Sequence, residues 1–224
     1  MQVKLISVTP RAEQQIVEIA RVSSSRKDRS SKPEGLINYL IKHSHWSPFE
    51  HGHMTLFFET SKAIGIQLIR HRSFTFQEFS QRYQDVGLLD NMFEDVELRK
   101  QATDNRQSST EIFDPKIPGF EYGGLNLPLN ANGLVKRHLV QSQRLYRDLI
   151  EVGVAREQAR MILPLCTKTK IYMTGPIRSW IHFFKLRDDA HAQKEIQLVA
   201  KAGKQIFIDK FPIISKALQY DQEL

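Results

Sequence analysis

The chain has 224 residues, of which 41% are hydrophobic and 25% are charged, which is the composition of a folded globular protein and excludes a disordered one. The net charge of +7 indicates anionic partners, and the single cysteine excludes an internal disulfide framework and predicts a reducing, cytoplasmic location. No apolar run approaches the roughly 20 residues that cross a bilayer, which argues against a membrane partner. The N-terminus lacks the basic start and apolar segment of a signal peptide.

The basic residues are spread along the chain, which bears on the kind of anion that they bind. Their densest run, Arg26 to Arg29, is diluted by Asp28 and flanked by serines. Single-stranded nucleic acid is bound by basic stretches interleaved with aromatic residues, and the sequence contains no such block. We therefore expect a small anionic ligand and no nucleic acid, with a basic nucleic-acid-binding module as the alternative interpretation.

The N-terminal half of the sequence predicts strands alternating with helices. Thr9-Pro10 has the pattern of a helix start, with Thr9 as the N-cap and Pro10 at the first helical position. After Pro33, apolar residues at i, i+4 spacing predict a helix with one buried face. In chain order we expect a strand over 2–8, a helix from Thr9, a polar loop over 23–32, a helix from Pro33, a loop over 43–53, a strand over 54–60 and a helix over 61–72.

The segment after Arg72 is expected to be extended. Side chains repeat every two residues along an extended chain, so Glu78, Ser80 and Arg82 would project to the same side. An acceptor, a hydroxyl and a cation would then lie in one row.

The C-terminal half is predicted to be mainly helical after a loop-rich segment. Residues 84–130 contain several glycines and prolines and predict loops, with a short polar helix over 97–106. A long helix over 132–152 ends at Gly153 and carries a narrow seam formed by Val135, Leu139, Ser142, Tyr146 and Leu149. We further expect a short helix over 155–163, a strand over 166–174 with Thr167, Thr169, Ile171 and Met173 on one side, and helices over 177–187 and 190–209.

Together these elements predict an α+β fold. A mixed or antiparallel central sheet would be packed by several helices, one of them long. No internal repeat or low-complexity tract occurs, and we expect a single domain over residues 1–224 that includes the loop-rich segment 84–130.

Histidines and the cysteine are the first candidates for chemistry. His43, His45, His51 and His53 lie close together in the sequence, as metal ligands do, but a metal site needs a defined geometry and usually a further ligand. We expect local hydrogen bonds or ligand contacts and no metal, with a histidine–metal hydrolase as a second alternative. Cys166 follows an apolar run, which predicts a buried thiol and not a nucleophile.

Arginines recur at the ends of apolar helical segments and beside aromatic residues. An unpaired charge there costs free energy unless an anionic ligand supplies the partner. Arginine forks match phosphates and other planar anions in two-point contacts, so the density of arginine suggests an anionic, heterocyclic ligand. We expect a joint anion-binding role for Arg70, Arg72, Arg82, Arg160, Arg178 and Arg187.

Several stretches that together cover nearly the whole chain resemble the flavin-dependent thymidylate synthases. The signature is Arg70-His-Arg72 followed, after seven residues, by Ser80. The other stretches, in the family's order, are Ala20-Arg-Val-Ser23, His43-x-His45-x-Ser-Pro-Phe-Glu-His51, Gln67-x-x-Arg70, Glu78-x-Ser80-x-Arg82-Tyr83, Arg156-Glu-x-Ala-Arg160-x-x-Leu-Pro164, and Arg178-Ser-x-x-x-Phe-x-x-Leu-Arg187-x-x-x-His191-Ala-Gln193.

The resemblance implies an enzyme that methylates dUMP to dTMP with 5,10-methylenetetrahydrofolate as carbon donor, FAD as hydride carrier and NADPH as reductant, without a cysteine nucleophile. It also implies a homotetramer with active sites at subunit interfaces. Arg187 would be catalytic, since a cation near the uracil carbonyl and N3 region favours the ionised, more nucleophilic ring.

The resemblance also implies which residues hold each ligand. The substrate-binding residues would be Gln67, Leu68, Ile69, Arg70, Glu78, Phe79, Ser80, Gln81, Arg82, Arg160 and Arg187. The cofactor-binding residues would be Ser47, Arg70, His71, Arg72, Glu78, Pro176, Ile177, Arg178 and His182, with Ser23, His45 and Glu50 near the flavin.

Three positions depart from the family's pattern. Pro176 stands where members often have Asn, so a side-chain contact to the flavin would be lost there while a backbone contact remains. Ser47 stands where Thr is common and keeps the hydroxyl. Gln81 stands where a small residue is frequent, which would crowd the phosphate and add a donor. None of the three removes an essential group.

Overall fold

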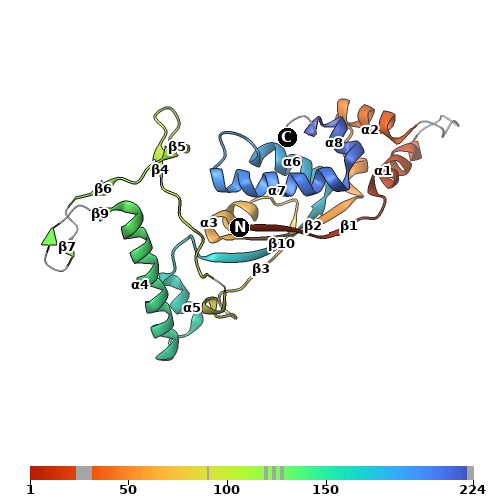
Figure 1. Ribbon diagram of the computed structural model, residues 1–224. Helices are drawn as coiled ribbons and strands as arrows, with labels where there is room; N and C mark the ends of the chain where they lie inside the picture. The colour runs from red at the N-terminus through yellow and green to blue at the C-terminus, as the bar shows by residue number, and fades with distance from the viewer. Residues whose placement is uncertain (24–31, 90, 119–120, 123–124, 127–128, 221–224) are drawn as a thin grey trace. The chain divides into compact units, whose positions relative to one another are not determined.

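The computed structural model of the chain describes residues 1–23, 32–89, 91–118, 121–122, 125–126 and 129–220. The chain forms two compact units, whose elements are labelled in Figure 1. Unit 1 comprises Met1–Glu59, Gln67–Gln77 and Ile171–Leu224, and unit 2 comprises Thr60–Ile66 and Glu78–Lys170. The predicted α+β class is confirmed, whereas the single domain stays a prediction. Most of the predicted loop over 23–32 lies outside the described residues.

A four-stranded sheet with the order β1-β2-β10-β3 organises unit 1. β1 and β2 pair antiparallel, with Leu5 opposite Leu56 and a register shift between Leu5 and Ser7. Met54, Leu56 and Phe58 are fully buried at alternate positions of β2, because successive side chains of a strand point to opposite faces. The four strands are β1 (Gln2–Val8), β2 (His53–Ser61), β10 (Lys168–Pro176) and β3 (Thr75–Glu78).

Helices pack against this sheet and against one another. α7 packs against both β1 and α6, and α2 packs against α1 and α8 (Figure 1). The helical segments of unit 1 are α1 (Ala12–Ala20), α2 (Pro33–Lys42), α6 (Ile177–Arg187), α7 (Lys194–Lys210) and α8 (Pro212–Ala217), with short 3-10 turns η1 (Arg21–Ser23) and η2 (Ser47–Glu50).

Aromatic side chains from α6 form the centre of the unit 1 core. The ring of Trp180 lies 5.7 Å from that of Phe183 and 5.8 Å from that of Phe184, between ring centroids. The indole Nε1 of Trp180 donates to the Met54 carbonyl of β2 at 3.0 Å. Phe184 also packs edge-on against Phe207 of α7 at 5.4 Å. These contacts fix the buried face of α6, so its exposed face is held in a defined place.

Two predicted helix boundaries in unit 1 are wrong. Thr9 does not cap a helix, because it extends the strand pairing: its N–H donates to the His53 carbonyl and its Oγ1 accepts from the His53 N–H, both at 2.9 Å. α1 therefore begins only at Ala12, after Arg11 with φ 52°. The last helix begins at Lys194 and not at residue 190, and Pro212 opens the further helix α8, which the sequence did not predict.

The predicted helix over 61–72 is also too long. α3 spans Lys62–Leu68. Beyond it, the chain makes tight turns, in which the His71 N–H donates to the Leu68 carbonyl and the Phe74 N–H donates to the His71 carbonyl, each at 3.1 Å. The turns bring the signature arginines out of helical geometry, so helical spacing does not govern where Arg70 and Arg72 lie.

Unit 2 is built around the long helix α4 (Ala131–Glu151). Ser142 and Tyr146 of the predicted seam are buried, and Gly153 follows the helix with φ 92°, as expected for a helix stop. Tyr146 packs with Val86 at the centre of a small core and accepts the Val86 N–H at 3.3 Å. The other elements are α5 (Arg156–Ala159), η3 (Val86–Leu88), η4 (Arg160–Ile162) and three strand pairs: β4 (Arg99–Gln101) with β5 (Ser109–Ile112), β6 (Lys116–Ile117) with β9 (Leu129–Asn130), and β7 (Glu121–Tyr122) with β8 (Leu125–Asn126).

The predicted polar helix over 97–106 is wrong. β4 (Arg99–Gln101) pairs antiparallel with β5 (Ser109–Ile112) instead. Gln101 Nε2 donates to the Ser108 carbonyl at 2.9 Å and so helps to close the connection between the strands. The segment has no apolar stripe at helical spacing, so side-chain bonds within the turn decide its conformation.

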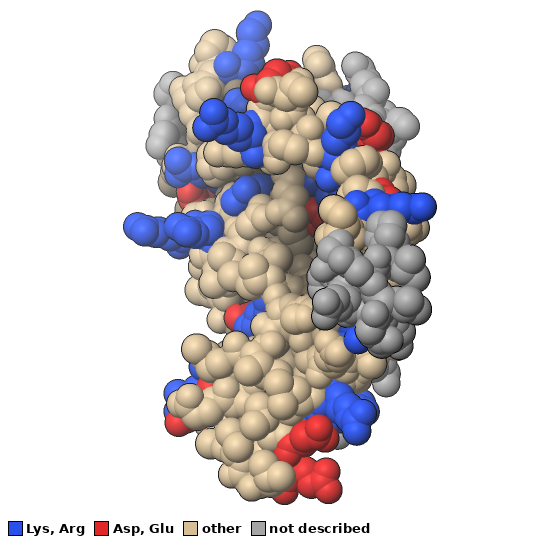
Figure 2. All heavy atoms as spheres, turned by 90° about the vertical axis from the view of Figure 1, so that its left-hand side faces the viewer, with Lys and Arg blue, Asp and Glu red and all other residues tan. Residues whose placement is uncertain are grey.

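The surface is consistent with dispersed basic charge. On the face drawn in Figure 2, lysine and arginine side chains lie in several separate groups with uncharged residues between them. Within the described part of the chain, none of the helices combines the length and the apolar character needed to cross a membrane.

Two glycine substitutions are expected to change stability in opposite directions. A Cβ at Gly175 of β10 would overlap the Phe74 ring, so Gly175→Ala should destabilise the fold by about 1–3 kcal/mol. A Cβ at Gly133 of α4 meets nothing within 4 Å, so Gly133→Ala should be neutral or stabilise the helix by up to about 1 kcal/mol. Urea unfolding followed by circular dichroism measures both, and a Gly175→Ala protein as stable as the parent would contradict this packing.

Candidate functional site

A cavity of about 580 Å³ opens in unit 1 beside the exposed face of α6. Arg178, His182 and Lys185 of α6 line it, because residues spaced by four and three share one face of a helix. Glu50 enters from η2, and its Oε1 accepts from Arg178 Nη1 at 2.6 Å. The remaining lining residues are Trp46, Ser73, Ser179 and Ile181.

The lining of the cavity favours an anionic, partly aromatic ligand. Arg178 and Lys185 carry two positive charges and Glu50 carries one negative charge, so an anion is favoured by the balance of charge. Trp46 and Ile181 supply apolar surface, and Ser73 and Ser179 supply hydroxyl groups. Such a mixture of apolar walls and a few polar groups is typical of cofactor sites.

Arg187, at the end of α6, is held by two hydrogen bonds inside unit 1. Its Nε donates to His71 Nε2 at 2.9 Å, and its Nη2 donates to the Gln67 carbonyl at 3.3 Å. Burial lowers the pKa of the Arg187 guanidinium below its ordinary value. The sequence-predicted residues Gln67, His71 and Arg187 are therefore brought together.

His71 is a neutral, buried partner in this cluster. Its pKa is lowered to about 4, first by burial and then by the positive charge of Arg187 and by His182. The ring packs edge-on against Phe183, with 5.0 Å between centroids, and against Phe74, with 6.3 Å. Because Nε2 accepts a hydrogen bond, the proton of the neutral ring belongs on Nδ1.

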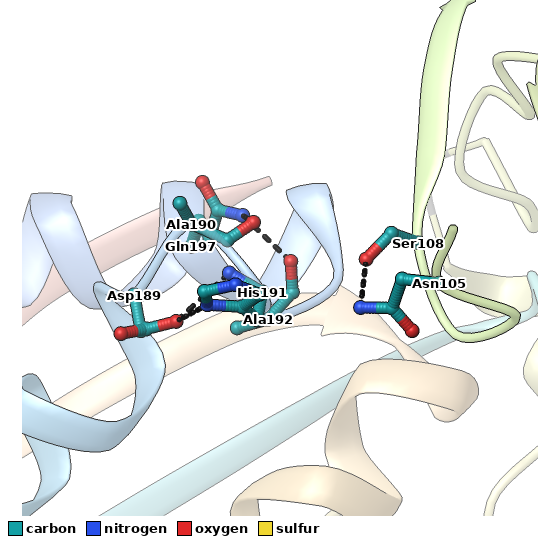
Figure 3. A network of polar contacts seen from close by, with 7 residues as sticks. All are labelled: Asn105, Ser108, Asp189, Ala190, His191, Ala192 and Gln197. Carbon is teal, nitrogen blue, oxygen red and sulfur yellow. Dashed lines mark hydrogen bonds and ion pairs between the residues drawn. The ribbon is translucent and has the colours of Figure 1, made fainter. Parts of the chain in front are cut away.

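The segment between α6 and α7 is fixed by local bonds just beyond Arg187. Asp189 Oδ1 accepts from the His191 N–H and lies 2.8 Å from His191 Nδ1 (Figure 3). The His191 N–H bond is the largest cause that lowers the Asp189 pKa. Gln197 Nε2 donates to the Ala192 carbonyl at 2.6 Å, and Gln67 Nε2 donates to Gln193 Oε1, also at 2.6 Å. The connection between the two helices is therefore held by bonds within itself, to α7 and to Gln67 of α3.

Figure 3 also draws a bond that belongs to unit 2. Asn105 Nδ2 donates to Ser108 Oγ at 2.8 Å, in the connection between β4 and β5. With the Gln101 bond to the Ser108 carbonyl, it stabilises that turn.

Glu78 is held by two side chains in unit 2. Its Oε1 accepts from Lys62 Nζ and from Thr169 Oγ1, each at 2.8 Å. Thr169 is fully buried, whereas the Glu78 side chain is partly exposed. Glu78 is therefore an oriented carboxylate whose negative charge is compensated by Lys62.

The expected row of Glu78, Ser80 and Arg82 is wrong. β3 ends at Glu78, and the chain turns so that the Ser80 carbonyl accepts the N–H groups of Tyr83 at 3.2 Å and Gln84 at 3.0 Å. Two-residue periodicity does not apply in a turn. Gln81 is buried at 7% exposure, and its Nε2 has no hydrogen-bond partner among the described residues.

Three arginines of unit 2 bind at Tyr83 and Glu157. Arg82 Nε lies 3.5 Å from Glu157 Oε2, and Arg156 Nη1 donates to the Tyr83 carbonyl at 3.2 Å. Arg160 Nε donates to the Glu157 carbonyl at 3.3 Å. Arg82 and Arg160 are thus brought together in unit 2, and Arg178 and Arg187 both lie on α6 in unit 1.

The other predicted site residues differ in exposure. Leu68 and Ile177 are fully buried core residues, and Phe79 packs against the unit 2 core. Pro176 is half-buried at the end of β10. The side chain of Ser23 lies outside the described residues. Those with exposed side chains are His45, Ser47, Ile69, Arg70, Arg72 and His182.

The sequence did not single out several residues that line the cavity. Trp46, Ser73, Ser179, Ile181 and Lys185 belong to this group. Lys185 could have been found, because it follows His182 by three positions on a predicted helix. Ser73 could not, since its position depends on the turns after α3.

Two of the histidines at 43–53 pack against an aromatic ring. Tyr39 packs against His43 at 4.3 Å and against His45 at 5.8 Å, between ring centroids. Within the described ranges, no group of three or more His, Cys, Asp or Glu residues could hold a metal ion. Cys166 is partly exposed and not buried as expected, and burial of its thiol still raises its pKa and favours the neutral form.

The chain is similar to known enzymes along nearly its whole length. The family model described as thymidylate synthase complementing protein matches residues 4–213. The chain is 42% identical over 228 residues to a probable flavin-dependent thymidylate synthase of Paramecium bursaria Chlorella virus 1, covering 98% of this chain and 100% of that protein. It is 38% identical to a flavin-dependent thymidylate synthase of Synechocystis (92% and 88% covered) and 36% identical to one of Thermosipho melanesiensis (88% and 81% covered). The resemblance noted in the sequence is confirmed: the chain belongs to the thymidylate synthase complementing protein family.

Proposed function

We propose that this chain is a flavin-dependent thymidylate synthase that converts dUMP to dTMP. The carbon comes from 5,10-methylenetetrahydrofolate and the reducing power from NADPH. The observation that carries the proposal is the family match over residues 4–213, which includes every residue proposed for the site. FAD, when bound, supplies the hydride transfer that the reductive methylation needs. A neutral Cys166 thiol agrees with a reaction that needs no cysteine nucleophile.

The cavity of unit 1 has the donors that FAD would need. A diphosphate is bound by cationic side chains and hydroxyl groups, which Arg178, Lys185 and Ser179 offer. A planar ring system packs against aromatic surface, which Trp46 offers. We propose that these groups hold the cofactor together with Glu50 and His182, and that exposed Arg70 and Arg72 of the same unit contribute.

Arg187 is the residue proposed to act on the pyrimidine. A guanidinium near the uracil carbonyl and N3 stabilises the negative charge that develops when the ring becomes nucleophilic at C5. The partial burial of Arg187 strengthens this interaction, because a charge acts more strongly where water is excluded. Gln67 and the group from Glu78 to Arg82, with Arg160, are proposed to hold the rest of dUMP.

We also propose a homotetramer whose active sites are completed by neighbouring subunits. The proposal follows from the resemblance to the flavin-dependent thymidylate synthases along nearly the whole chain. Light scattering should give a mass about four times the 26.0 kDa of the chain, and a fully active monomer would contradict it. The cytoplasmic location stays a prediction.

Arg82→Ala is expected to weaken dUMP binding by about 10- to 100-fold, because a charge-assisted hydrogen bond contributes about 1.5–3 kcal/mol. FAD affinity should change by less than about threefold, since Arg82 is proposed to contact the nucleotide phosphate and not the cofactor. Calorimetric titration of each ligand measures both effects. Arg144→Ala removes an exposed charge of α4 and serves as the control. Equal losses for dUMP and FAD would contradict the assignment.

The test of the function is product formation. Purified protein supplied with FAD, NADPH, 5,10-methylenetetrahydrofolate and dUMP should form dTMP, and omission of any one of them should stop it. Absence of dTMP from the complete mixture, with FAD bound, would contradict the proposed function.

A further inference from the structure

We infer that His71 is the positioning residue for Arg187, and that its Nε2 lone pair holds the guanidinium with one edge turned to the substrate. This inference rests on the proposed role of Arg187. It gives the central histidine of the Arg70-His-Arg72 signature a task that differs from the direct flavin contact implied by the sequence.

Two hydrogen bonds hold one edge of the Arg187 guanidinium. Arg187 Nε donates a hydrogen bond to His71 Nε2 at 2.9 Å, and Arg187 Nη2 donates one to the Gln67 carbonyl at 3.3 Å. Nε and Nη2 share one edge of the planar group, so both anchors bind the same edge. Within the described part of the chain, the structure gives Arg187 no further hydrogen bond or ion pair. The edge formed by Nη1 and the second Nη2 hydrogen therefore stays available for a two-point contact with a ligand.

The side chain of His71 is itself held in place by its packing. His71 is 9% exposed, and its ring lies edge-on to Phe183 and Phe74. Its backbone is fixed as well, because its N–H and carbonyl form the bonds to Leu68 and Phe74 that make the turn after α3. A ring held on both sides offers its Nε2 acceptor in one direction, so the Arg187 side chain loses much of its freedom before substrate binds.

His71 must be neutral to accept the hydrogen bond from Arg187. A protonated His71 would place a positive charge next to Arg187 and would turn the Nε2 acceptor into a donor. Burial, Arg187 and His182 all lower the His71 pKa, so the ring stays a neutral acceptor around neutral pH. A lysine at position 187 could not reproduce the arrangement, since it has no second edge to offer.

Two variants separate a positioning role from a general packing role. The amide oxygen of glutamine can take the place of Nε2, whereas that of asparagine reaches only the Nδ1 position. We expect His71→Asn to lower kcat by about 10- to 100-fold relative to His71→Gln, because a displacement of about 1 Å at the reacting group costs up to about 100-fold. The two variants should differ little in melting temperature. Equal kcat values for folded His71→Gln and His71→Asn would overturn the inference.

A second measurement does not depend on activity. Nitrogen-15 NMR of histidine-labelled protein without ligands reports which ring nitrogen carries the proton, and the signals missing in His71→Gln identify those of His71. We expect protonated Nδ1 and unprotonated Nε2 at pH 7, with the same pattern at pH 6. A protonated Nε2 would overturn the inference. A wild-type protein that makes no dTMP but shows the expected NMR pattern would contradict the proposed function and leave the His71–Arg187 hydrogen bond supported.

Discussion

Replacing Arg187 with alanine is expected to lower the rate of dTMP formation by about 100- to 1,000-fold, a loss of about 2.7–4 kcal/mol in transition-state stabilisation. The guanidinium is the group proposed to face the charge that develops on the pyrimidine ring, and its partial burial makes that charge interaction stronger. The loss should fall mainly on kcat, because the interaction is stronger in the transition state than in the bound substrate. Steady-state kinetics with dUMP as the varied substrate measure it.

Two controls make the Arg187 result interpretable. The variant should keep its circular dichroism spectrum and its FAD affinity, since the Arg187 side chain bonds to His71 and to the Gln67 carbonyl and is not one of the buried core residues. Arg147→Ala, which removes an exposed arginine of α4, should keep the parental rate. A folded, FAD-loaded Arg187→Ala protein with turnover within about threefold of the parent would exclude Arg187 as the catalytic residue.

Phe184→Ala is expected to destabilise the core of unit 1 by about 3–5 kcal/mol. Phe184 is 1% exposed and packs against Trp180, Phe183 and Phe207, with ring centroids 5.4–5.8 Å apart. The substitution would leave a cavity between α6 and α7, because rings that contact one another on several sides cannot close the gap without losing their own contacts.

The effect on unfolding distinguishes this core position from its neighbour on the helix. Leu186 is 48% exposed on the same helix, so Leu186→Ala should change the free energy of unfolding by less than about 0.5 kcal/mol. Urea unfolding followed by tryptophan fluorescence reports both variants, since Trp180 lies against Phe184. A loss below about 1 kcal/mol for Phe184→Ala would mean that the aromatic cluster is not the core of unit 1.

Apolar periodicity predicted most of the regular elements. The buried face of the strand with Thr167, Thr169, Ile171 and Met173 is confirmed, because alternation along a strand is visible in the sequence itself. The stop at Gly153 is confirmed by its positive φ. The helix predicted over 97–106 is wrong because hydrogen bonds from Gln101 and Asn105 close a turn there. A polar segment has no periodic pattern of apolar residues that would reveal such bonds.

Residue types predicted the kind of site, but contacts far apart in sequence decided its geometry. Arginine and histidine in the signature indicated an anionic ligand, and Glu50, Arg178 and His182 do line one cavity. The bond between His71 and Arg187 joins residues 116 positions apart, and no local pattern encodes it. Such a pair becomes visible only when the sheet and α6 bring both side chains to one place.

The visible absorption spectrum of the purified protein with FAD tests the central claim most directly. The protein should bind FAD and show the visible absorption of an oxidised flavin. NADPH should bleach this absorption under anaerobic conditions, and dUMP should then perturb the spectrum of the bound flavin. A protein that refuses FAD, keeps its spectrum when NADPH is added and does not respond to dUMP would contradict the proposal that these arginines bind a flavin and a nucleotide together.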